Sequence, residues 1–458
     1  MTCPHGWGAI NTMKIVIAGA GEVGFHLAEL LANADKSIVL IDTNRDVLDY
    51  AATHLDVLTL RGDACSIDVL KEAGIESTGL FLAMTTSEKA NLVSSILAKK
   101  LGAKKTIARV TNLEYLAEEQ QESFRELGID VLMSPRQLAA EEIKRLLNRC
   151  SFTDVHEFED GRINLVGITL DDASPLINRP LSEIDVHCGR NGVQPIAVLR
   201  NHETIIPRGH TTLHQNDHVY FITKEKSTQF LENYVGKKSH KVRRVMIIGG
   251  TGLGFETARM LENQFQVTLV EKDKERCKLL AEHLPKTLVI NGEPSNIELL
   301  EEEGLDSMDA FVALTTNSET NIITSLTAKN HGVVKTIAQV ENKEYVHISQ
   351  RIGVDTLINK KLIAANNIFR HLRKGKVEAV TGLHGVDAEV IEYIVHKNNQ
   401  LTRKPLKDLH FPKQALVGGV IRGESSFVPN GEFQLQLDDR VIVFALPEAI
   451  NRVEKLFR

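Results

Sequence analysis

The sequence has little of what three common classes of protein require. Its 54 Lys and Arg residues are outnumbered by 60 Asp and Glu residues, so it lacks the basic excess typical of nucleic-acid binding. Its apolar runs are broken by charge or glycine before they reach the ~18 residues of a membrane-spanning helix. Its five cysteines are scattered and never in CxxC spacing, which indicates neither a disulfide framework nor a zinc knuckle. These absences predict a cytoplasmic protein with no nucleic-acid partner and no membrane span.

The first residues also lack a targeting signal. Residues 1–12 have no positive segment followed by an apolar one, and a strong strand pattern begins only after Met13. We interpret Met13 as the functional start, with an ordered N-terminal arm around Trp7 as the alternative. The remaining length predicts two to four domains at ~100–200 residues each.

The chain repeats itself over nearly its whole length. The segment from Lys14 to Gly24, KIVIAGAGEVG, returns at Val245 to Gly254 as VMIIGGTGLG. The offset between Gly19 and Gly249 is constant, since it also relates these pairs: Thr85 and Thr315, Thr86 and Thr316, Asn91 and Asn321, Arg109 and Gln339. A second constant offset relates Arg200 to Arg422, Pro207 to Pro429 and Asp217 to Asp439. A larger and a smaller module are therefore each present twice, in alternation.

The two modules differ in their hydrophobic patterns. The larger one alternates short apolar runs, such as residues 14–18, 37–41 and 79–83, with amphipathic helical segments, which predicts a parallel sheet covered on both faces. The smaller one has β-rich runs separated by turn residues, which predicts an α+β domain. We therefore expect an α/β fold of two Rossmann-type parallel-sheet domains, each followed by a small α+β domain. The predicted boundaries are 13–149, 150–235, 241–373 and 374–458.

A glycine motif follows the first predicted strand. Gly19, Gly21 and Gly24 form GxGxxG between a strand and a helix, the setting that makes this pattern a dinucleotide-binding fingerprint. The helix N-terminus offers unpaired N–H groups to phosphates. Asp42 ends the second predicted strand at the spacing that the fingerprint requires, where a carboxylate accepts ribose hydroxyls and repels a 2′-phosphate. NAD(H) or an adenine nucleotide is favoured over NADP, and a glycine turn in an unliganded domain is the alternative.

Other polar residues end the following strands, at the edge where open α/β sheets bind ligands. Asp63 follows the third strand, Thr85 and Thr86 follow the fourth, and Arg109 ends the fifth. The two threonines have an alternative role in capping the next helix. Arg109 could grip phosphate oxygens or form a surface ion pair.

The second copy departs from the first at informative positions. Thr251 replaces the second glycine and hinders backbone approach to a pyrophosphate, although Gly250 and Gly252 beside it could open another route. Glu271 or Asp273 could replace Asp42. Gln339 replaces Arg109 and removes its positive charge. The sequence leaves nucleotide binding in this copy open, either weaker or of different specificity.

No catalytic or metal-binding constellation emerges. His210, His214 and His218 have helical spacing, but turn signals bracket them, and scattered surface histidines are the preferred interpretation over a zinc face. A dehydrogenase would need a second domain with a general acid or base, and the two small modules share no such set. The alternative is regulatory, since nucleotide binding can shift a conformational equilibrium. An NAD-dependent oxidoreductase therefore remains the alternative to a non-enzymatic sensor.

Several of these motifs together resemble one family. The segment from Ile17 to Gly24, then Ile41-Asp42, Gly62-Asp63, Met84-Thr85-Thr86 and residues 107–110 in register, are similar to the TrkA family of potassium uptake proteins, built from tandem regulator-of-potassium-conductance (RCK) modules. The resemblance extends over residues 13–458. It implies a cytoplasmic subunit, peripheral on the inner face of the membrane, that binds NAD(H) or ATP/ADP. It also implies assembly, commonly as a tetramer, beneath a membrane potassium transporter subunit of the TrkH/TrkG type.

The resemblance assigns nucleotide contacts to positions in both copies. In the first copy they are Gly19, Ala20, Gly21, Glu22, Val23, Asp42, Thr85, Thr86 and Arg109. In the second copy they are Gly249, Gly250, Thr251, Gly252, Leu253, Glu271, Thr315 and Thr316. The loss of the arginine in the second copy puts the identity of its ligand in doubt.

Overall fold

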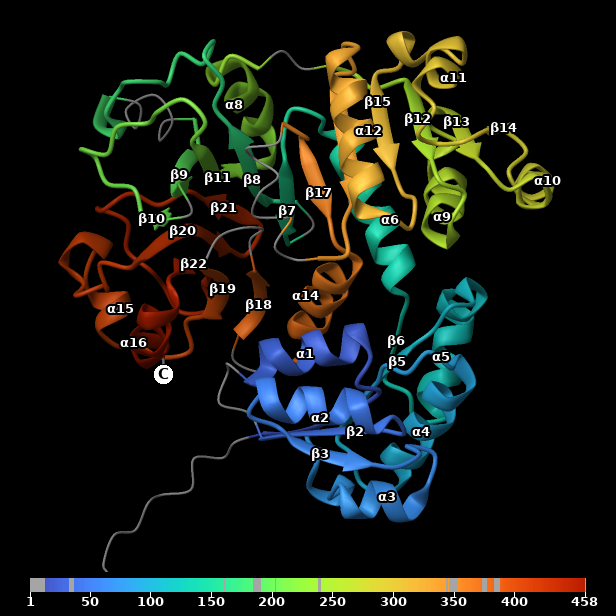
Figure 1. The fold of residues 1–458 in the computed structure, drawn as a ribbon. Coiled ribbons are helices and arrows are strands. Elements are labelled where there is room, and N and C mark those ends of the chain that lie inside the picture. The colour runs from blue at the N-terminus through green and yellow to red at the C-terminus, as the bar shows by residue number, and fades with distance from the viewer. Residues whose placement is uncertain are drawn as a thin grey trace, which may run out of the picture. The chain divides into compact units, whose positions relative to one another are not determined.

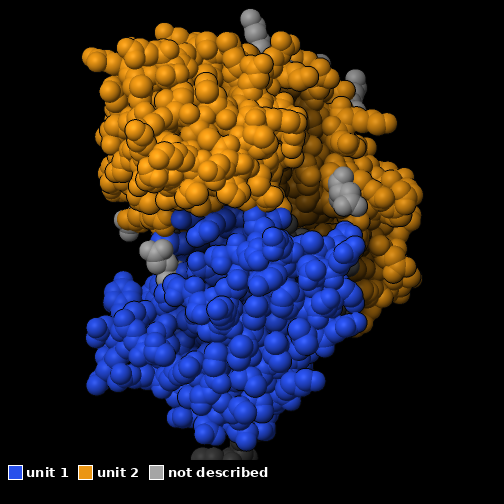
Figure 2. All heavy atoms as spheres, turned by 90° about the vertical axis from the view of Figure 1, so that its right-hand side faces the viewer, with its two compact units in different colours: residues 1–138, 360–365 blue, residues 139–359, 366–458 orange. Residues whose placement is uncertain are grey.

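The computed structural model divides the chain into two compact units. It describes residues 13–32, 37–159, 161–183, 191–201, 203–237, 240–342, 345, 353–372, 377–382 and 388–457. One unit comprises Met1–Leu138 with Lys360–Ala365, and the other comprises Ala139–Asn359 with Asn366–Arg458 (Figure 2). Among the described helices, none has the length and apolarity to cross a bilayer.

The first unit holds a six-stranded parallel sheet in the order β3-β2-β1-β4-β5-β6 (Figure 1). This is the strand order of a doubly wound dinucleotide-binding domain. The strands expected from the sequence are confirmed, with small shifts at their ends. The elements of this domain are β1 (Lys14–Ala18), α1 (Glu22–Ala32), β2 (Ser37–Asp42), α2 (Arg45–His54), β3 (Leu58–Arg61), α3 (Ile67–Glu72), β4 (Leu80–Ala83), α4 (Glu88–Lys100), β5 (Lys105–Arg109), α5 (Glu118–Glu126) and β6 (Val131–Met133). They are followed by α6 (Pro135–Asn148), which begins in the first unit and continues in the second.

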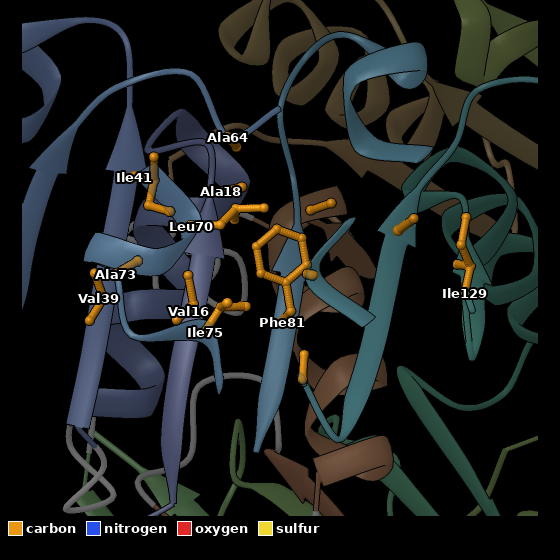
Figure 3. Close-up of a cluster of buried hydrophobic side chains, with 14 of the residues drawn as sticks. Val16, Ala18, Val39, Ile41, Ala64, Leu70, Ala73, Ile75, Phe81 and Ile129 are labelled. Atoms are coloured by element: carbon orange, nitrogen blue, oxygen red, sulfur yellow. The ribbon is translucent and has the colours of Figure 1, made fainter. Parts of the chain in front are cut away.

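The central strands of this sheet are buried because both faces are covered. Val16, Ala18 and Phe81 come from the adjacent strands β1 and β4 and lie in one cluster with Leu70 of α3 (Figure 3). Phe81 and Leu70 are fully buried. The continuous apolar runs that predicted the sheet are thus the residues that form its core.

The second parallel sheet repeats the first strand for strand, in the order β14-β13-β12-β15-β16-β17. It lies in the second unit. Its elements are β12 (Arg244–Ile248), α9 (Gly252–Leu261), β13 (Gln266–Glu271), α10 (Lys274–His283), β14 (Leu288–Asn291), α11 (Ile297–Glu302), β15 (Ala310–Ala313), α12 (Ser318–Asn330), β16 (Lys335–Gln339), β17 (Thr356–Ile358) and α14 (Lys360–Leu372).

Two five-stranded antiparallel sheets form the small modules. Their orders, β10-β9-β11-β8-β7 and β18-β19-β22-β20-β21, are equivalent when one is read in reverse. The first contains β7 (Asp154–Phe158), β8 (Ile163–Thr169), β9 (Val193–Arg200), β10 (Glu203–Ile205), β11 (His218–Lys224) and α8 (Thr228–Tyr234). The second contains β18 (Val377–Gly382), β19 (Glu389–Ile394), α15 (Gln400–Arg403), β20 (Ala415–Arg422), β21 (Ser425–Phe427), β22 (Arg440–Ala445) and α16 (Pro447–Phe457). The predicted duplication of both modules is confirmed.

The two small sheets pack against each other within the second unit. Tyr220 and Ile222 of the first sheet share a buried cluster with Ile442 and Phe444 of the second. Gly418 of β20 lies so close to the first sheet that a Cβ there would be 2.9 Å from Ile222 Cγ1. The small modules thus form a pair within the chain. The absence of a side chain at Gly418 lets the two sheets pack closely.

Each small domain contains the arginine–aspartate pair that recurs in the sequence. Arg200 Nε and Nη2 donate to Asp217 at 2.8 and 2.6 Å, and Arg422 donates to Asp439 at 2.7 and 2.8 Å. Both aspartates are buried. The same bidentate ion pair therefore occurs at matching positions of both small domains. This explains why its arginine and aspartate recur at a constant offset in the sequence.

Candidate nucleotide-binding sites

The first glycine loop lies against the end of β4. Gly19 has φ +99°, and a Cβ on it would be 2.8 Å from the backbone nitrogen of Thr85. A Cβ on Gly24 would be 1.8 Å from the carbonyl oxygen of Gly19. Only glycine satisfies both positions, so the motif allows the turn from β1 into α1 to pack tightly on the sheet.

Gly21 differs from its two partners because it faces open space. It is exposed, and a Cβ on it would meet no atom within 4 Å. Glu22 and Val23 follow it in the first turn of α1. The first N–H groups of a helix have no intrahelical acceptor, which makes this the usual place for an anion to bind. Packing therefore does not require a glycine here, whereas close approach of a ligand to the backbone would.

The Asp42 carboxylate anchors the same loop. Its Oδ2 accepts a hydrogen bond from Ala20 N at 2.7 Å, and its Oδ1 accepts one from Asn44 N at 2.8 Å. A carboxylate has about four acceptor positions, so these bonds leave capacity for ribose hydroxyls. Asp42 thus links the glycine loop to the end of β2, a positioning role that sequence reasoning did not foresee.

Asn91 joins the two remaining strand ends. Its side-chain oxygen accepts from Thr85 N at 2.9 Å and Thr85 Oγ1 at 2.7 Å, and its amide donates to Thr85 O and Arg109 O at 3.0 and 2.9 Å. It is buried on α4. The structure therefore brings Gly19, Ala20, Asp42, Thr85 and the Arg109 backbone to one edge of the sheet, with Thr86 exposed beside them.

Two carboxylates beside this edge have structural roles. Asp63 Oδ1 accepts from Cys65 N at 2.9 Å and closes the turn after β3. Glu88 Oε2 accepts from Asn112 N at 2.7 Å and Thr111 N at 2.5 Å, which holds the loop after Arg109. Burial raises the pKa of Glu88, but the bonds from Asn112 and Thr111 outweigh it and leave this pKa below its usual value. Sequence reasoning missed Glu88.

The second copy reproduces the same frame. Gly249 has φ +93°, Gly250 N donates to Glu271 Oε2 at 2.7 Å, and Asp273 N donates to Glu271 Oε1 at 3.0 Å. Asn321 binds Thr315 and Gln339 O with the distances seen for Asn91. Of the two acidic residues considered as the counterpart of Asp42, Glu271 has its geometry. Asp273 instead caps α10 through Arg276 N.

The second loop differs where Thr251 replaces Gly21. Thr251 Oγ1 accepts from Gly254 N at 3.2 Å and donates to Leu314 O at 2.9 Å. The side chain thus bridges the helix N-terminus and the end of β15, and it bonds a helix N–H as Gly21, which has no side chain, cannot. Leu253 follows it, buried in the first turn of α9, and Thr316 is exposed.

The other route considered in this copy involves Gly250 and Gly252, and the structure fills the space at Gly250. A Cβ on Gly250 would be 2.5 Å from Leu280 Cδ1 and 3.0 Å from Glu271 Oε2, so this residue faces the interior. Gln339 is buried, and its amide donates to Glu341 Oε1 at 2.7 Å. The second loop therefore keeps the scaffold of the first but presents a less open surface.

The interpretation of His210, His214 and His218 as surface histidines is wrong for one of them. His210 and His214 are exposed as expected, but His218 is buried at 1% exposure. Its Nδ1 lies 2.9 Å from Thr169 Oγ1, and its Nε2 lies 3.2 Å from Asp154 Oδ2. These partners come from segments distant in the sequence, and contacts of this kind leave no trace in local spacing.

Comparison with protein families matches both modules twice. The TrkA-N domain matches residues 15–135 and 245–360, and the TrkA-C domain matches residues 165–236 and 390–458. The chain belongs to the TrkA family. A Trk system potassium uptake protein TrkA homolog of Archaeoglobus fulgidus is 35% identical over 97% of this chain and 100% of its own length. The TrkA proteins of Halomonas elongata and Haemophilus influenzae are 33% and 32% identical over 97% of this chain and 99% of their own length.

Solved structures share the fold at low identity. The GsuK RCK domain has a TM-score of 0.61 at 15% identity, covering 98% of this chain and 96% of its own. The GsuK channel bound to NAD has a TM-score of 0.61 at 16% identity, covering 98% and 79%. These likenesses show the same fold, and the two matches to each domain family confirm the resemblance to tandem RCK modules.

Family membership decides between the two functional hypotheses. TrkA proteins are regulatory components of Trk potassium uptake, with RCK modules that are not enzymatic. The oxidoreductase alternative is therefore set aside, and this chain is a regulatory subunit of a Trk potassium uptake system.

Proposed function

We propose that the first Rossmann-type domain is the principal nucleotide sensor of this TrkA-family subunit and that its ligand is NAD(H), with ATP or ADP as the alternative adenine nucleotides. The observation that carries the proposal is the open glycine loop joined to Asp42. Gly21 leaves room for a pyrophosphate above the N-terminus of α1, and Asp42 ends the adjacent strand. The GsuK channel bound to NAD, which shares this fold, supports the ligand class.

The proposed contacts divide by the part of the nucleotide they serve. Backbone groups of the loop and of the first turn of α1 would bind phosphates, Asp42 would bind ribose hydroxyls, and Thr85, Thr86 and Arg109 would face the remaining ligand. The residues of the first site are Gly19, Ala20, Gly21, Glu22, Val23, Asp42, Thr85, Thr86 and Arg109. A 2′-phosphate would meet the Asp42 carboxylate, which disfavours NADP.

The second domain is proposed as a weaker site. Its contacts would come from Gly249, Gly250, Thr251, Gly252, Leu253, Glu271, Thr315 and Thr316. Glu271 retains the geometry of Asp42, but Thr251 binds Leu314 O across the space that a pyrophosphate would need. A dinucleotide would have to break that bond, and the ligand there would gain no charge from Gln339.

Control of transport would follow from differential affinity. A nucleotide that bridges the loop, Asp42 and the end of β4 favours whichever arrangement of the domains keeps these groups together. Because the modules occur twice in one chain, copies can assemble as a symmetric homo-oligomer, which we propose is a tetramer. It would act from the cytoplasmic face on a membrane subunit of the TrkH/TrkG type.

The test is isothermal titration calorimetry of the full chain with NADH, NAD+, NADPH, ATP and ADP. We expect adenine nucleotides to bind and NADPH to bind much more weakly. Asp42→Arg should abolish binding at the first site, since it replaces the ribose acceptor with a cation and frees Ala20 N.

The matched control is Asp46→Asn, which removes an exposed carboxylate a short way along the chain. It should leave every affinity within error. Preferential binding of NADPH, or equal affinity in the Asp42→Arg variant, would refute the assignment of Asp42.

A further inference from the structure

A cavity separate from both glycine loops lies within the second unit. It has a volume of about 170 Å³ and is lined by residues of the first small domain and by the β16–β17 region of the second Rossmann-type domain. Its lining includes Lys335, the first residue of β16, and Ser151, which precedes β7. The cavity is thus at a junction between two of the chain's modules.

Lys335 is a buried ammonium without a directly paired carboxylate. Its side chain is 1% exposed, and its Nζ donates to Phe152 O at 2.7 Å and Thr356 Oγ1 at 3.0 Å. Among the described residues, no carboxylate lies within ion-pair distance of this nitrogen. Both acceptors are neutral and the ammonium has three N–H donors, so one donor is unused and the charge has no contacting counter-ion.

The carboxylates that line the cavity are already engaged elsewhere. Both Asp355 oxygens accept from Lys329 Nζ, at 2.7 and 2.8 Å. Asp154 Oδ2 accepts from Thr153 Oγ1 at 2.8 Å and lies 3.2 Å from His218 Nε2. The Ser151 hydroxyl, in contrast, is buried beside the Cys150 thiol and meets no hydrogen-bond partner of good geometry among the described residues. The cavity therefore presents an unused N–H of Lys335 and the Ser151 hydroxyl, while both of its carboxylates already have partners.

The size of the cavity limits its occupant. Sites for drug-sized ligands occupy roughly 300–1,000 Å³, so this one is too small for a nucleotide. We propose that it binds one small oxyanion, such as inorganic phosphate, between the Lys335 ammonium and the Ser151 hydroxyl. The anion would compensate a buried charge and connect the segment before β7 to the first residues of β16 and β17.

The corresponding residue of the first copy provides a comparison. Lys105 begins β5 as Lys335 begins β16, but Lys105 is only partly buried. Burial lowers the pKa of Lys335, against the opposing effects of Asp355, Cys150 and Asp154 nearby. A bound anion would counter that effect, since it favours the charged ammonium.

The test is calorimetric titration of the full chain, in phosphate-free buffer, with inorganic phosphate and separately with acetate as a carboxylate. We expect a saturable phosphate site that Lys335→Met weakens about 10-fold or more, the effect of losing one charge-assisted hydrogen bond. Lys105→Met should keep the wild-type affinity. Tighter binding of acetate than of phosphate, lost in Lys335→Met, would identify the oxyanion as a carboxylate and support the same site.

Two results would overturn the proposal. The first is that the wild-type chain shows no saturable anion binding. The second is that phosphate binds equally well after Lys335→Met, which would place the anion at a glycine loop instead. If Lys335→Met fails to fold, Ser151→Leu decides, because it fills the cavity and leaves Lys335 in place. Unchanged phosphate affinity in Ser151→Leu would equally refute the site.

Discussion

The two glycine loops share one frame and differ in one decisive side chain. In both, an acidic residue accepts from the residue after the first glycine at 2.7 Å, and a buried asparagine holds the adjacent strand end. Gly21 leaves the space above its helix open, whereas Thr251 bridges that space to Leu314 O. The comparison teaches that the frame of a glycine loop can be kept while the space above its helix becomes less open.

The largest effect that we expect is a difference in stability between substitutions at two glycines of the first loop, one that packs against the sheet and one that faces open space. Gly24→Val would place a side chain where even a Cβ lies 1.8 Å from Gly19 O, so it should destabilise the first domain by about 4 kcal/mol. Gly21→Ala should change stability by less than about 0.5 kcal/mol, since nothing surrounds it. Thermal unfolding of the two variants measures the difference, and equal destabilisation would refute the division of roles.

Exchanging the residues at positions 21 and 251 should weaken nucleotide binding at the first loop and strengthen it at the second. Gly21→Thr should weaken NADH binding at the first loop about 100-fold, or about 2.7 kcal/mol, because the side chain enters the pyrophosphate space. Thr251→Gly should strengthen binding at the second loop, at a cost of a few tenths of a kcal/mol in helix capping. Calorimetry of both variants tests this, and a Gly21→Thr chain with wild-type affinity would contradict it.

The two small domains differ in a buried carboxyl group, which should make the stability of the second one depend on pH. Glu392 and Gly167 occupy equivalent positions opposite Ile442 and Tyr220. Burial raises the pKa of Glu392 to about 7, although Arg440 Nε lies 3.7 Å from its Oε1. A raised carboxyl pKa means that the folded state holds the proton more tightly, so stability falls as pH rises between about 4.5 and 7.

Glu392→Gln should remove this pH dependence. Between pH 5 and 8 the wild-type chain should lose about 2 kcal/mol more stability than the variant does. Chemical denaturation across that pH range measures the difference. A parallel decline of the two proteins would show that folding does not raise the pKa of Glu392.

The smallest effect concerns the asparagines behind the two loops. Asn91→Ala and Asn321→Ala each remove four matching hydrogen bonds and should destabilise their own domains similarly. Asn91→Ala should weaken NADH binding at the tighter, first site by about 10-fold, whereas Asn321→Ala should leave the affinity of that site unchanged, since it lies behind the other loop. An equal loss of affinity at the tighter site in both variants would contradict its assignment to the first loop.

Sequence reasoning reached the fold because its signals are local. Apolar runs separated by helical patterns predicted each parallel strand, and a constant offset between matching residues predicted the second copy. The same offset carried Asn91 to Asn321, but without coordinates nothing showed that this amide joins two strand ends. Glu88 was missed for a similar reason, since its partners Thr111 and Asn112 lie far along the chain, in the loop after β5.

The sequence by itself determined the order of modules, the glycine loops and the role of Asp42 as the acidic end of the second strand, because periodicity and spacing encode them, but it left Glu271 and Asp273 as alternatives in the second copy. Only the tertiary structure decided that Thr251 closes its loop, that His218 is buried and that Lys335 lacks a contacting carboxylate among the residues described. Each of these depends on which distant atoms come into hydrogen-bond range, a property of packing between segments. Local pattern carries no such information, so similar motifs can differ in what they are able to bind.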